Sequence, residues 1–351
     1  MPPVTVRIMH PEPAADAGPL ERWVATERSA LARWHCEGFA AAGAPDVAVV
    51  SGPPDATSFG ARLRALVRAD RPAGLVVLGS GAIPLATASD LRDFVAVAGA
   101  EERLALANNR YSADVVAIAG AWPSLAEVPD LPSDNALPRW LEEVAGYEVR
   151  DLRRRWRLAI DIDGPLDLVL LGTDSGRDVD LGRVKAAIVA VRRTAGDPRA
   201  ELLVAGRTSA ATLAWLERSA AARTRALIEE RGLRTSVAGQ RPPASVLGAL
   251  LERDGPESLG AHLRRFGEAA IVDTRVLLAH RLGADESDWP VAEDRFASDL
   301  LLAERIADPW LRALTESAAS APIPILLGGH TLVGPGVRLV VAGRPPGPRW
   351  R

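Results

Sequence analysis

Short apolar runs alternate with longer amphipathic segments along the first half of the chain. The helical segments carry their apolar side chains on one face, whereas the strand runs are almost entirely apolar. Because strands and helices alternate, we expect an α/β fold built on a three-layer, mainly parallel sheet of Rossmann type. The predicted strands are residues 4–9, 46–51, 74–78 and 115–119, and the predicted helices are residues 20–42, 59–68 and 136–146.

The apolar run at residues 157–172, RLAIDIDGPLDLVLLG, is interrupted by three aspartates and a Gly-Pro turn. We predict a buried strand before the turn and a helix after it. Asp161 and Asp163 would then share one face at the strand exit, where their oxygens could hold one hard cation. Alternatively, Asp163 caps the helix, with Pro165 in the first turn and Asp167 favoured by the helix dipole. The frequency of Asp at helix starts favours the cap.

A glycine-rich loop follows the third predicted strand. Its small residues allow a sharp turn, and Ser89 is a suitable cap for a helix that begins near Asp90. Open α/β sheets bind ligands in such loops, at the carboxyl ends of their strands. The loop residues Gly79, Ser80 and Gly81 are therefore candidates for cofactor binding, although many loops of this kind need glycine only to turn.

A polar cluster, NNRYSAD, precedes the strand predicted at residues 115–119. Asn108, Asn109, Arg110 and Ser112 carry hydrogen-bonding side chains that could line a pocket. A turn rich in Asn and Ser is the ordinary explanation of the same residues.

The second half of the chain is richer in predicted helix. We expect a strand at residues 201–205 and helices at residues 181–193, 210–232, 245–253 and 258–266. The broad apolar face of residues 210–232 would serve as core or as a homodimer interface.

Two groups of polar residues in this half are candidates for chemistry. Asp273, Arg275 and His280 could form a polar site, although a paired Asp and Arg at a domain interface is the more ordinary arrangement. His330 lies in the glycine-rich segment GGHTLVGPG and is the best general base by residue type. A purely structural histidine in a glycine turn is the favoured alternative.

Composition and charge narrow the class of protein. At 351 residues we expect two domains, residues 1–172 and residues 173–351, the latter helix-rich. The formal net charge of -3 gives no global electrostatic reason to expect nucleic acid as a partner. The arginines between residues 150 and 157 form a locally basic edge, or a rim that meets a phosphorylated substrate.

The single cysteine, Cys36, excludes an intrachain disulfide, which fits a reducing compartment. We find no signal-peptide pattern and no apolar run long enough to span a bilayer. The expectation is a cytoplasmic protein without a membrane partner.

Two motifs resemble those of a known family. VVLGSGAIPLATASDL at residues 76–91 is similar to vvlgaDxPlltpeDL of GT-A-like nucleotidyltransferases, and IDIDGPLDL at residues 160–168 is similar to their later motif lDiDTPEDL. The resemblance is greatest for the group that includes 2-phospho-L-lactate guanylyltransferase and molybdenum cofactor guanylyltransferase, and it covers residues 4–172. It implies that a nucleoside triphosphate and a phosphorylated acceptor meet on a divalent metal, here expected to be Mg²⁺.

By this resemblance Asp163 matches the later metal-site position, with Asp161 as its neighbour or support. The asparagine-rich cluster at residues 108–112 would lie near the nucleotide by position only. Two features depart from the family pattern. Ala82 stands near the first metal aspartate, and residues 10–19 lack the basic, glycine-rich loop that cradles the triphosphate.

Three functions follow from these motifs and departures. The leading one is a nucleotidyltransferase-like protein that binds a nucleotide or a phosphorylated small molecule. The second is a catalytically inactive relative, a pseudoenzyme that acts as a ligand-binding or partner subunit. The third is a nucleotide-sugar glycosyltransferase-like enzyme that uses Mg²⁺ or Mn²⁺.

Overall fold

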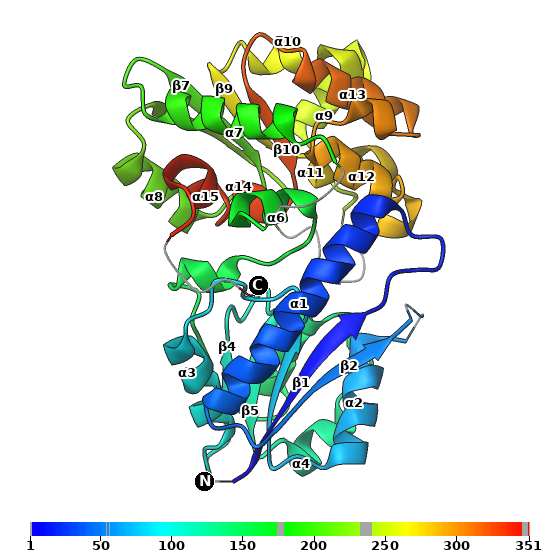
Figure 1. Ribbon diagram of the computed structural model, residues 1–351, viewed down its shortest axis with the longest axis vertical. Helices are drawn as coiled ribbons and strands as arrows, with labels where there is room; N and C mark the ends of the chain where they lie inside the picture. The colour runs from blue at the N-terminus through cyan, green and yellow to red at the C-terminus, as the bar shows by residue number, and fades with distance from the viewer. Residues whose placement is uncertain are drawn as a thin grey trace. The chain divides into compact units, whose positions relative to one another are not determined.

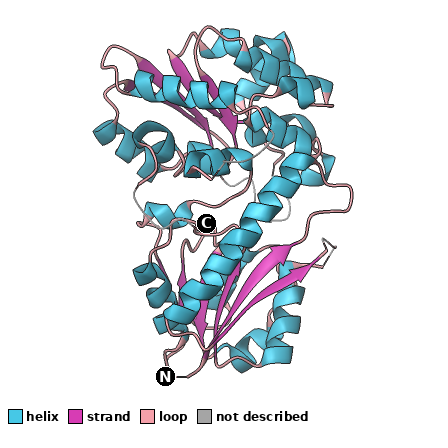
Figure 2. Ribbon diagram, in the orientation of Figure 1, coloured by secondary structure: helices cyan, strands magenta, loops and turns pink. Residues whose placement is uncertain are grey.

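The computed structural model describes residues 2–53, 55, 57–173, 179–231, 241–345 and 350. The chain divides into two units (Figure 1). The first comprises residues 1–17, 25–162 and 346–351, and the second comprises residues 18–24 and 163–345. Strands gather in two groups, and helices accompany each group (Figure 2). The boundary predicted near residue 172 thus falls within the second unit.

The sheet of the first unit has the strand order β2-β1-β3-β5-β4-β6 within the described residues. β1 pairs in parallel with β2 and β3, β4 pairs in parallel with β6, and β5 runs antiparallel to β3 and β4. The sheet is therefore mixed but mainly parallel. Its strands are β1 (Val4–Pro11), β2 (Asp46–Gly52), β3 (Gly74–Gly79), β4 (Leu104–Ala107), β5 (Val115–Ala119) and β6 (Glu148–Asp151).

Alternate residues of β3 enter two separate apolar cores. Val76 and Leu78 pack in one core with apolar residues of α1 (Pro19–Ala41) and α3 (Ala88–Ala98). Leu75 and Val77 pack in the other core with residues of α2 (Phe59–Asp70) and α5 (Leu137–Glu143). A strand that is apolar on both faces needs cover on both sides, which gives helix, sheet and helix layers. The α/β architecture predicted for this part is confirmed.

The second unit has its own sheet, in the order β10-β9-β7-β8, and all its described pairings are parallel. β7 lies between β8 and β9, so the strand order reverses between β7 and β9. Open α/β sheets bind ligands beyond the carboxyl ends of their strands at such a reversal. The strands are β7 (Glu201–Gly206), β8 (Arg223–Ile228), β9 (Ala269–Asp273) and β10 (Ile325–Gly328).

The helices of the second unit connect and flank these strands. They are α6 (Pro165–Leu171), α7 (Gly182–Ala195), α8 (Ala210–Ser219), α9 (Val246–Asp254), α10 (Leu259–Leu263), α11 (Thr274–Leu282), α12 (Ala292–Asp299), α13 (Pro309–Ala319), α14 (His330–Val333) and α15 (Val337–Ala342). The first unit also contains α4 (Ala121–Ser124). Short 3-10 helices are η1 (Leu125–Glu127), η2 (Asp134–Ala136), η3 (Trp156–Ala159), η4 (Pro256–Ser258), η5 (Glu286–Asp288) and η6 (Ala303–Arg305).

The helix predicted at residues 210–232 is wrong over its second half. α8 ends at Ser219, and Ala220 already has an extended backbone, with ψ 140°. Residues from Arg223 onward form β8, which pairs in parallel with β7. Pairing with a strand formed earlier in the chain outweighs the local helical pattern, because it satisfies the backbone groups of both strands.

Two further local predictions are corrected. Instead of a buried strand before Asp161, the chain forms the 3-10 helix η3, and Asp161 makes only an isolated antiparallel bridge with Ala82. The helix expected near Asp90 begins at Ala88, where the side chain of Thr87 accepts the N–H of Asp90. Thr87 rather than Ser89 is the cap because the side chain of Asp90 reaches back to the Thr87 N–H at 2.8 Å.

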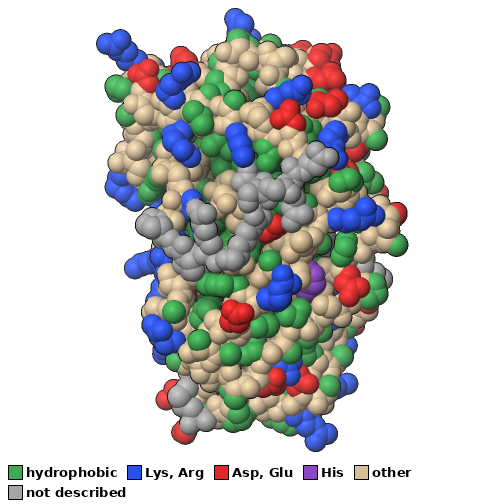
Figure 3. Space-filling model, viewed as in Figure 1, with side chains coloured by type: hydrophobic (Ala, Val, Ile, Leu, Met, Phe, Trp, Pro, Cys, Tyr) green, Lys and Arg blue, Asp and Glu red, His purple; other side chains and the backbone are tan. Residues whose placement is uncertain are grey.

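No helix in the described part of the chain combines the length and apolar character needed to cross a membrane. On the face that Figure 3 shows, basic and acidic side chains are interspersed on the described surface rather than gathered by sign.

Candidate functional site

Asp163 lies immediately before α6 but does not cap it. The N-cap residue is Gly164, and Pro165 occupies the first turn. The Oδ2 atom of Asp167 accepts the backbone N–H of Asp163 at 2.9 Å and that of Gly164 at 2.8 Å. Asp167 therefore supplies the acceptor that helix starts require. The prediction that Asp163 is the cap is wrong. The carboxylate of Asp163 contacts a different side chain.

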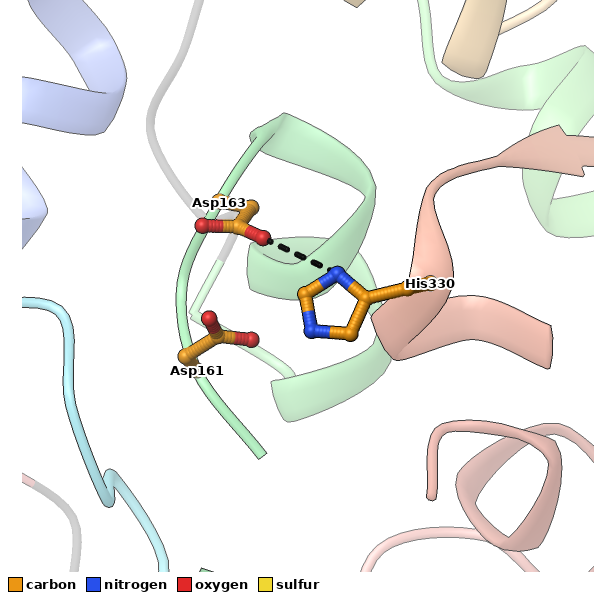
Figure 4. Close-up of side chains that lie close together, drawn as sticks. All are labelled: Asp161, Asp163 and His330. Atoms are coloured by element: carbon orange, nitrogen blue, oxygen red, sulfur yellow. Dashed lines mark ion pairs between the residues drawn. The ribbon is translucent and has the colours of Figure 1, made fainter. Parts of the chain in front are cut away.

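That contact is with His330, at the start of α14. The Oδ2 atom of Asp163 lies 3.6 Å from Nδ1 of His330, and the two side chains are 38% and 31% exposed. Figure 4 shows the pair facing each other. The separation is too long for a hydrogen bond. Two partly exposed metal-ligating side chains at this separation are arranged as ligands of one ion would be.

A buried ion pair lies beside Asp163. Arg275 and Asp299 form a bidentate pair in which Nη2 is 2.7 Å from Oδ2, and their side chains are 12% and 4% exposed. Burial alone would lower the pKa of Arg275, but the carboxylates of Asp299, Asp273 and Asp163 outweigh burial and raise it. Burial raises the pKa of Asp299, and the Arg275 guanidinium opposes that rise. Arg275 is thus permanently charged, and it interacts electrostatically with Asp163.

A second buried pair joins the ends of β7 and β9. Arg207 follows β7, and its Nε lies 2.6 Å from Oδ2 of Asp273, which ends β9. Gly206 makes this possible, because a Cβ there would lie 2.2 Å from the Cβ of Asp273 and its φ is +126°. Asp273 also accepts the backbone N–H of Arg275 at 3.2 Å. The two ion pairs therefore form one network at the carboxyl edge of the second sheet.

The prediction that Asp273, Arg275 and His280 form one polar site is wrong, because each of them has a different partner. Asp273 pairs with Arg207 and Arg275 pairs with Asp299, whereas Nδ1 of His280 accepts the N–H of Ser245 at 3.1 Å. The sequence did not single out Arg207 or Asp299. Arg207 could have been found from its place after a strand, but Asp299 ends α12 and carries no comparable signal.

The charged side chains around Arg275 are arranged in separate pairs. Asp163, Asp273 and Asp299 act on Arg275, and Arg207 neutralises Asp273. Arg295, which also acts on Asp299, is paired with Glu286. Arg207, Arg275 and Arg295 thus each have a carboxylate partner of their own.

Asp161 belongs to the first unit, where it bridges Ala82. Only Ile162 separates it from Asp163, so the chain holds the two Cα atoms within about 7 Å of each other. Ala82, which the resemblance places near a metal-binding aspartate, is 3% exposed. Its carbonyl oxygen lies 2.9 Å from Nε2 of the buried His35 in α1.

The glycine-rich loop after β3 is positioned by contacts within the first unit. Ser80 is 2% exposed, its N–H donates to the carbonyl of Met9 at 2.9 Å, and its hydroxyl lies 2.9 Å from Nδ1 of His10. Gly79 and Gly81 flank it. His10, which the sequence analysis did not propose as a site residue, is thereby brought to the candidate loop.

The asparagine-rich cluster forms the loop between the antiparallel strands β4 and β5. The amide of Asn108 donates to Asp114 and to the Leu158 carbonyl and accepts the N–H groups of Asp114 and Val115. Asn108 is 2% exposed and has a structural role in this loop. The other members make turn and surface contacts. The Asn109 side chain accepts the N–H of Tyr111, Arg110 pairs with Glu142, and the Ser112 N–H donates to the Asn109 carbonyl.

No protein-family model matches the sequence, and no curated protein is similar to it at a significant level.

Proposed function

We propose that this chain binds a nucleotide or another phosphorylated small molecule together with a divalent cation, as a nucleotidyltransferase-like protein. The observation that carries the proposal is the pair formed by Asp163 and His330, whose ligating atoms lie 3.6 Å apart. The α/β fold of the first unit and its mainly parallel sheet support the GT-A-like resemblance at the level of fold class.

The separation of the pair can be compared with coordination geometry. Ligands about 2.1 Å from one ion and 3.6 Å apart subtend an angle of about 120° at that ion. Octahedral Mg²⁺ places neighbouring ligands about 3.0 Å apart. Imidazole is also a poorer ligand for Mg²⁺ than for Zn²⁺ and other transition metals. With His330 as a ligand, the imidazole thus favours Zn²⁺ or another transition metal over the Mg²⁺ expected from the resemblance.

The charges around Asp163 explain why cation and phosphate would bind together. The Arg207 and Arg275 guanidiniums are engaged in buried ion pairs, so they compensate their own carboxylates first. A divalent ion at Asp163 would bring two positive charges to the site and so attract a phosphate. We therefore expect the phosphorylated ligand to bind only weakly without the cation.

One observation favours the non-catalytic alternative. Ala82 offers no carboxylate, and its carbonyl oxygen is bonded to His35 in the core. A site that lacks one of two metal aspartates binds a ligand more readily than it neutralises the charge of phosphoryl transfer. Binding without turnover would identify the chain as a ligand-binding relative.

Calorimetric titration tests the proposal. GTP, CTP and a UDP-sugar are titrated into the full chain with Mn²⁺, with Mg²⁺ and with EDTA. We expect at least one to bind, and to lose tenfold or more in affinity with EDTA or in Asp163→Asn. Asp288→Asn, which removes an exposed carboxylate of the same unit, is the matched control and should bind as wild type. Equal affinity in the presence of EDTA, or no binding of any nucleotide, would contradict the proposal.

A further inference from the structure

β2 is the outermost strand on one side of the first sheet (Figure 1). Its residues pair with β1 from Asp46 to Gly52, and the Gly52 carbonyl accepts the N–H of Glu12. No described residue forms a backbone hydrogen bond with the opposite edge of β2. Alternate N–H and C=O groups of the strand are therefore left for a further strand to bind.

The side chains of β2 do not protect this edge against pairing. Proteins usually protect an open edge with charged residues, with proline or by keeping the strand very short. β2 has seven residues, and from Val47 to Gly52 it contains neither a charged residue nor a proline. Val49 and Val50 are 37% and 39% exposed, and as neighbours in a strand they point to opposite faces of the sheet. The edge of β2 is thus apolar on both faces.

The other outer strands of the two described sheets are protected in these ways. β6 has only four residues, and Glu148, Arg150 and Asp151 among them are charged. β8 carries two exposed arginines, Arg223 and Arg225. β10 also has four residues, and all of them are buried. Among these four strands, β2 alone combines length with an uncharged, exposed edge.

We propose that the open edge of β2 pairs with β2 of a second copy of this chain, antiparallel and around a two-fold axis near Val49. In a two-fold interface the same surface of both copies meets, so each residue faces the one at equal distance beyond the axis. Val49 then faces Val49 of the second copy, and Ala48 faces Val50. Antiparallel outer strands on otherwise parallel sheets are common, so the added strand suits this mainly parallel sheet.

The distribution of charge supports a second copy as the partner. Asp46, the one charged residue of the strand, would face Gly52 of the second copy. Its charge is compensated within its own chain by Arg7 of β1, whose Nη2 lies 2.8 Å from Oδ2 of Asp46. Like charges directly opposite each other destabilise paired strands, and this pairing places none opposite each other. A charged foreign peptide would find no opposite charge between Val47 and Gly52.

The mass of the full chain in solution tests the inference. Sedimentation over a range of protein concentrations should show a dimer, of twice the 37.2 kDa of one chain. Val49→Lys places two like charges opposite each other at the axis and should raise the dimer dissociation constant about tenfold or more. Val189→Lys, at a valine of α7 that is 63% exposed, is the matched control and should dimerise as wild type.

Charge pairing separates loss of the interface from loss of the fold. Val49→Glu alone should be impaired like Val49→Lys, but an equimolar mixture of the two variants should form dimers, because opposite charges then face each other. Mixing would not restore variants that had merely unfolded. Hydrogen exchange gives a second measurement, since the outward amides of β2 should be protected in the wild-type dimer and exchange faster in Val49→Lys.

The dimer does not rest on the pair formed by Asp163 and His330. Asp163→Asn should therefore dimerise as wild type, and failure of the cation site is distinguishable from failure of this interface. A chain that is monomeric at every concentration would overturn the inference, as would a Val49→Lys dimer as stable as wild type. Failure of the mixed Lys and Glu variants to dimerise would equally overturn it.

Discussion

His35 should make the stability of this protein depend on pH between neutrality and pH 4. The side chain is 0% exposed, and its Nε2 donates to the Ala82 carbonyl at 2.9 Å. Its Nδ1 is buried without a hydrogen-bond partner among the described residues. Burial lowers the pKa of His35 from 6.5 to about 4, although the Ala82 carbonyl opposes the change.

The sign and size of the effect follow from that pKa. Between about pH 6.5 and 4, His35 is protonated in the unfolded chain but remains neutral in the folded chain. The free energy of unfolding therefore falls as the pH is lowered through this range. The full difference corresponds to about 3 kcal/mol, of which about 2 kcal/mol should be lost between pH 7 and pH 5. The loss above pH 5 precedes the titration of ordinary carboxyl groups.

Urea unfolding at pH 7, 6 and 5 measures this loss in wild type and in His35→Gln. The glutamine amide can still donate to the Ala82 carbonyl but does not titrate. The substitution itself changes the free energy of unfolding by the same amount at every pH. The difference between the two proteins in their pH dependence therefore reports the protonation of His35. We expect wild type to lose about 2 kcal/mol more than His35→Gln between pH 7 and pH 5. Equal losses in the two proteins would refute the buried, neutral histidine.

Two further predictions concern the network of the second unit. Asp299→Asn leaves the buried Arg275 without its anionic partner and should lower the free energy of unfolding by about 3–5 kcal/mol, measured by urea denaturation. Glu148→Gln, in an exposed pair with Arg150, should cost less than about 1 kcal/mol, and similar losses would argue against a buried network. Gly206→Ala should cost more than about 2 kcal/mol, because the new Cβ meets Asp273 at a positive φ. Gly283 also has a positive φ, +95°, but an added Cβ there would meet nothing within 4 Å, so Gly283→Ala should cost only about 1 kcal/mol. Equal melting temperatures for the two glycine variants would contradict the close approach of Gly206 to Asp273.

The layers of the first unit could be predicted because their signals are local. The run from Leu75 to Leu78 is apolar at every position, and such a strand requires cover on both faces. β8 could not be predicted in this way, because the segment around Leu227 satisfies a helical pattern as well as a strand pattern. Its pairing with β7 decides between them.

At the start of α6 the local pattern favours the wrong aspartate as the cap. Asp163 is the expected cap by residue type, but a carboxylate at the third helical position reaches back to the N–H groups before the helix. With Gly164 as the N-cap, Asp167 takes both N–H groups. A capping-box interpretation of the sequence would have assigned these roles correctly.

The candidate site itself depends on contacts that are distant in the sequence. Arg207 and Asp273 are 66 residues apart, and Arg275 and Asp299 are 24 residues apart. The sequence indicates Asp163 by its motif and His330 by its residue type, but only the fold places one beside the other. Sequence patterns give candidates of this kind, whereas the parallel sheet decides which of them meet.

Binding of Mn²⁺ to the full chain tests the central claim most directly, because it needs no knowledge of the organic ligand. Calorimetry should detect one Mn²⁺ site in wild type and in Asp288→Asn, and at least a tenfold loss of affinity in Asp163→Asn. His330→Ala should reduce the preference for Mn²⁺ over Mg²⁺, since it removes the imidazole ligand. Undiminished Mn²⁺ affinity in both Asp163→Asn and His330→Ala would contradict a cation site at this pair.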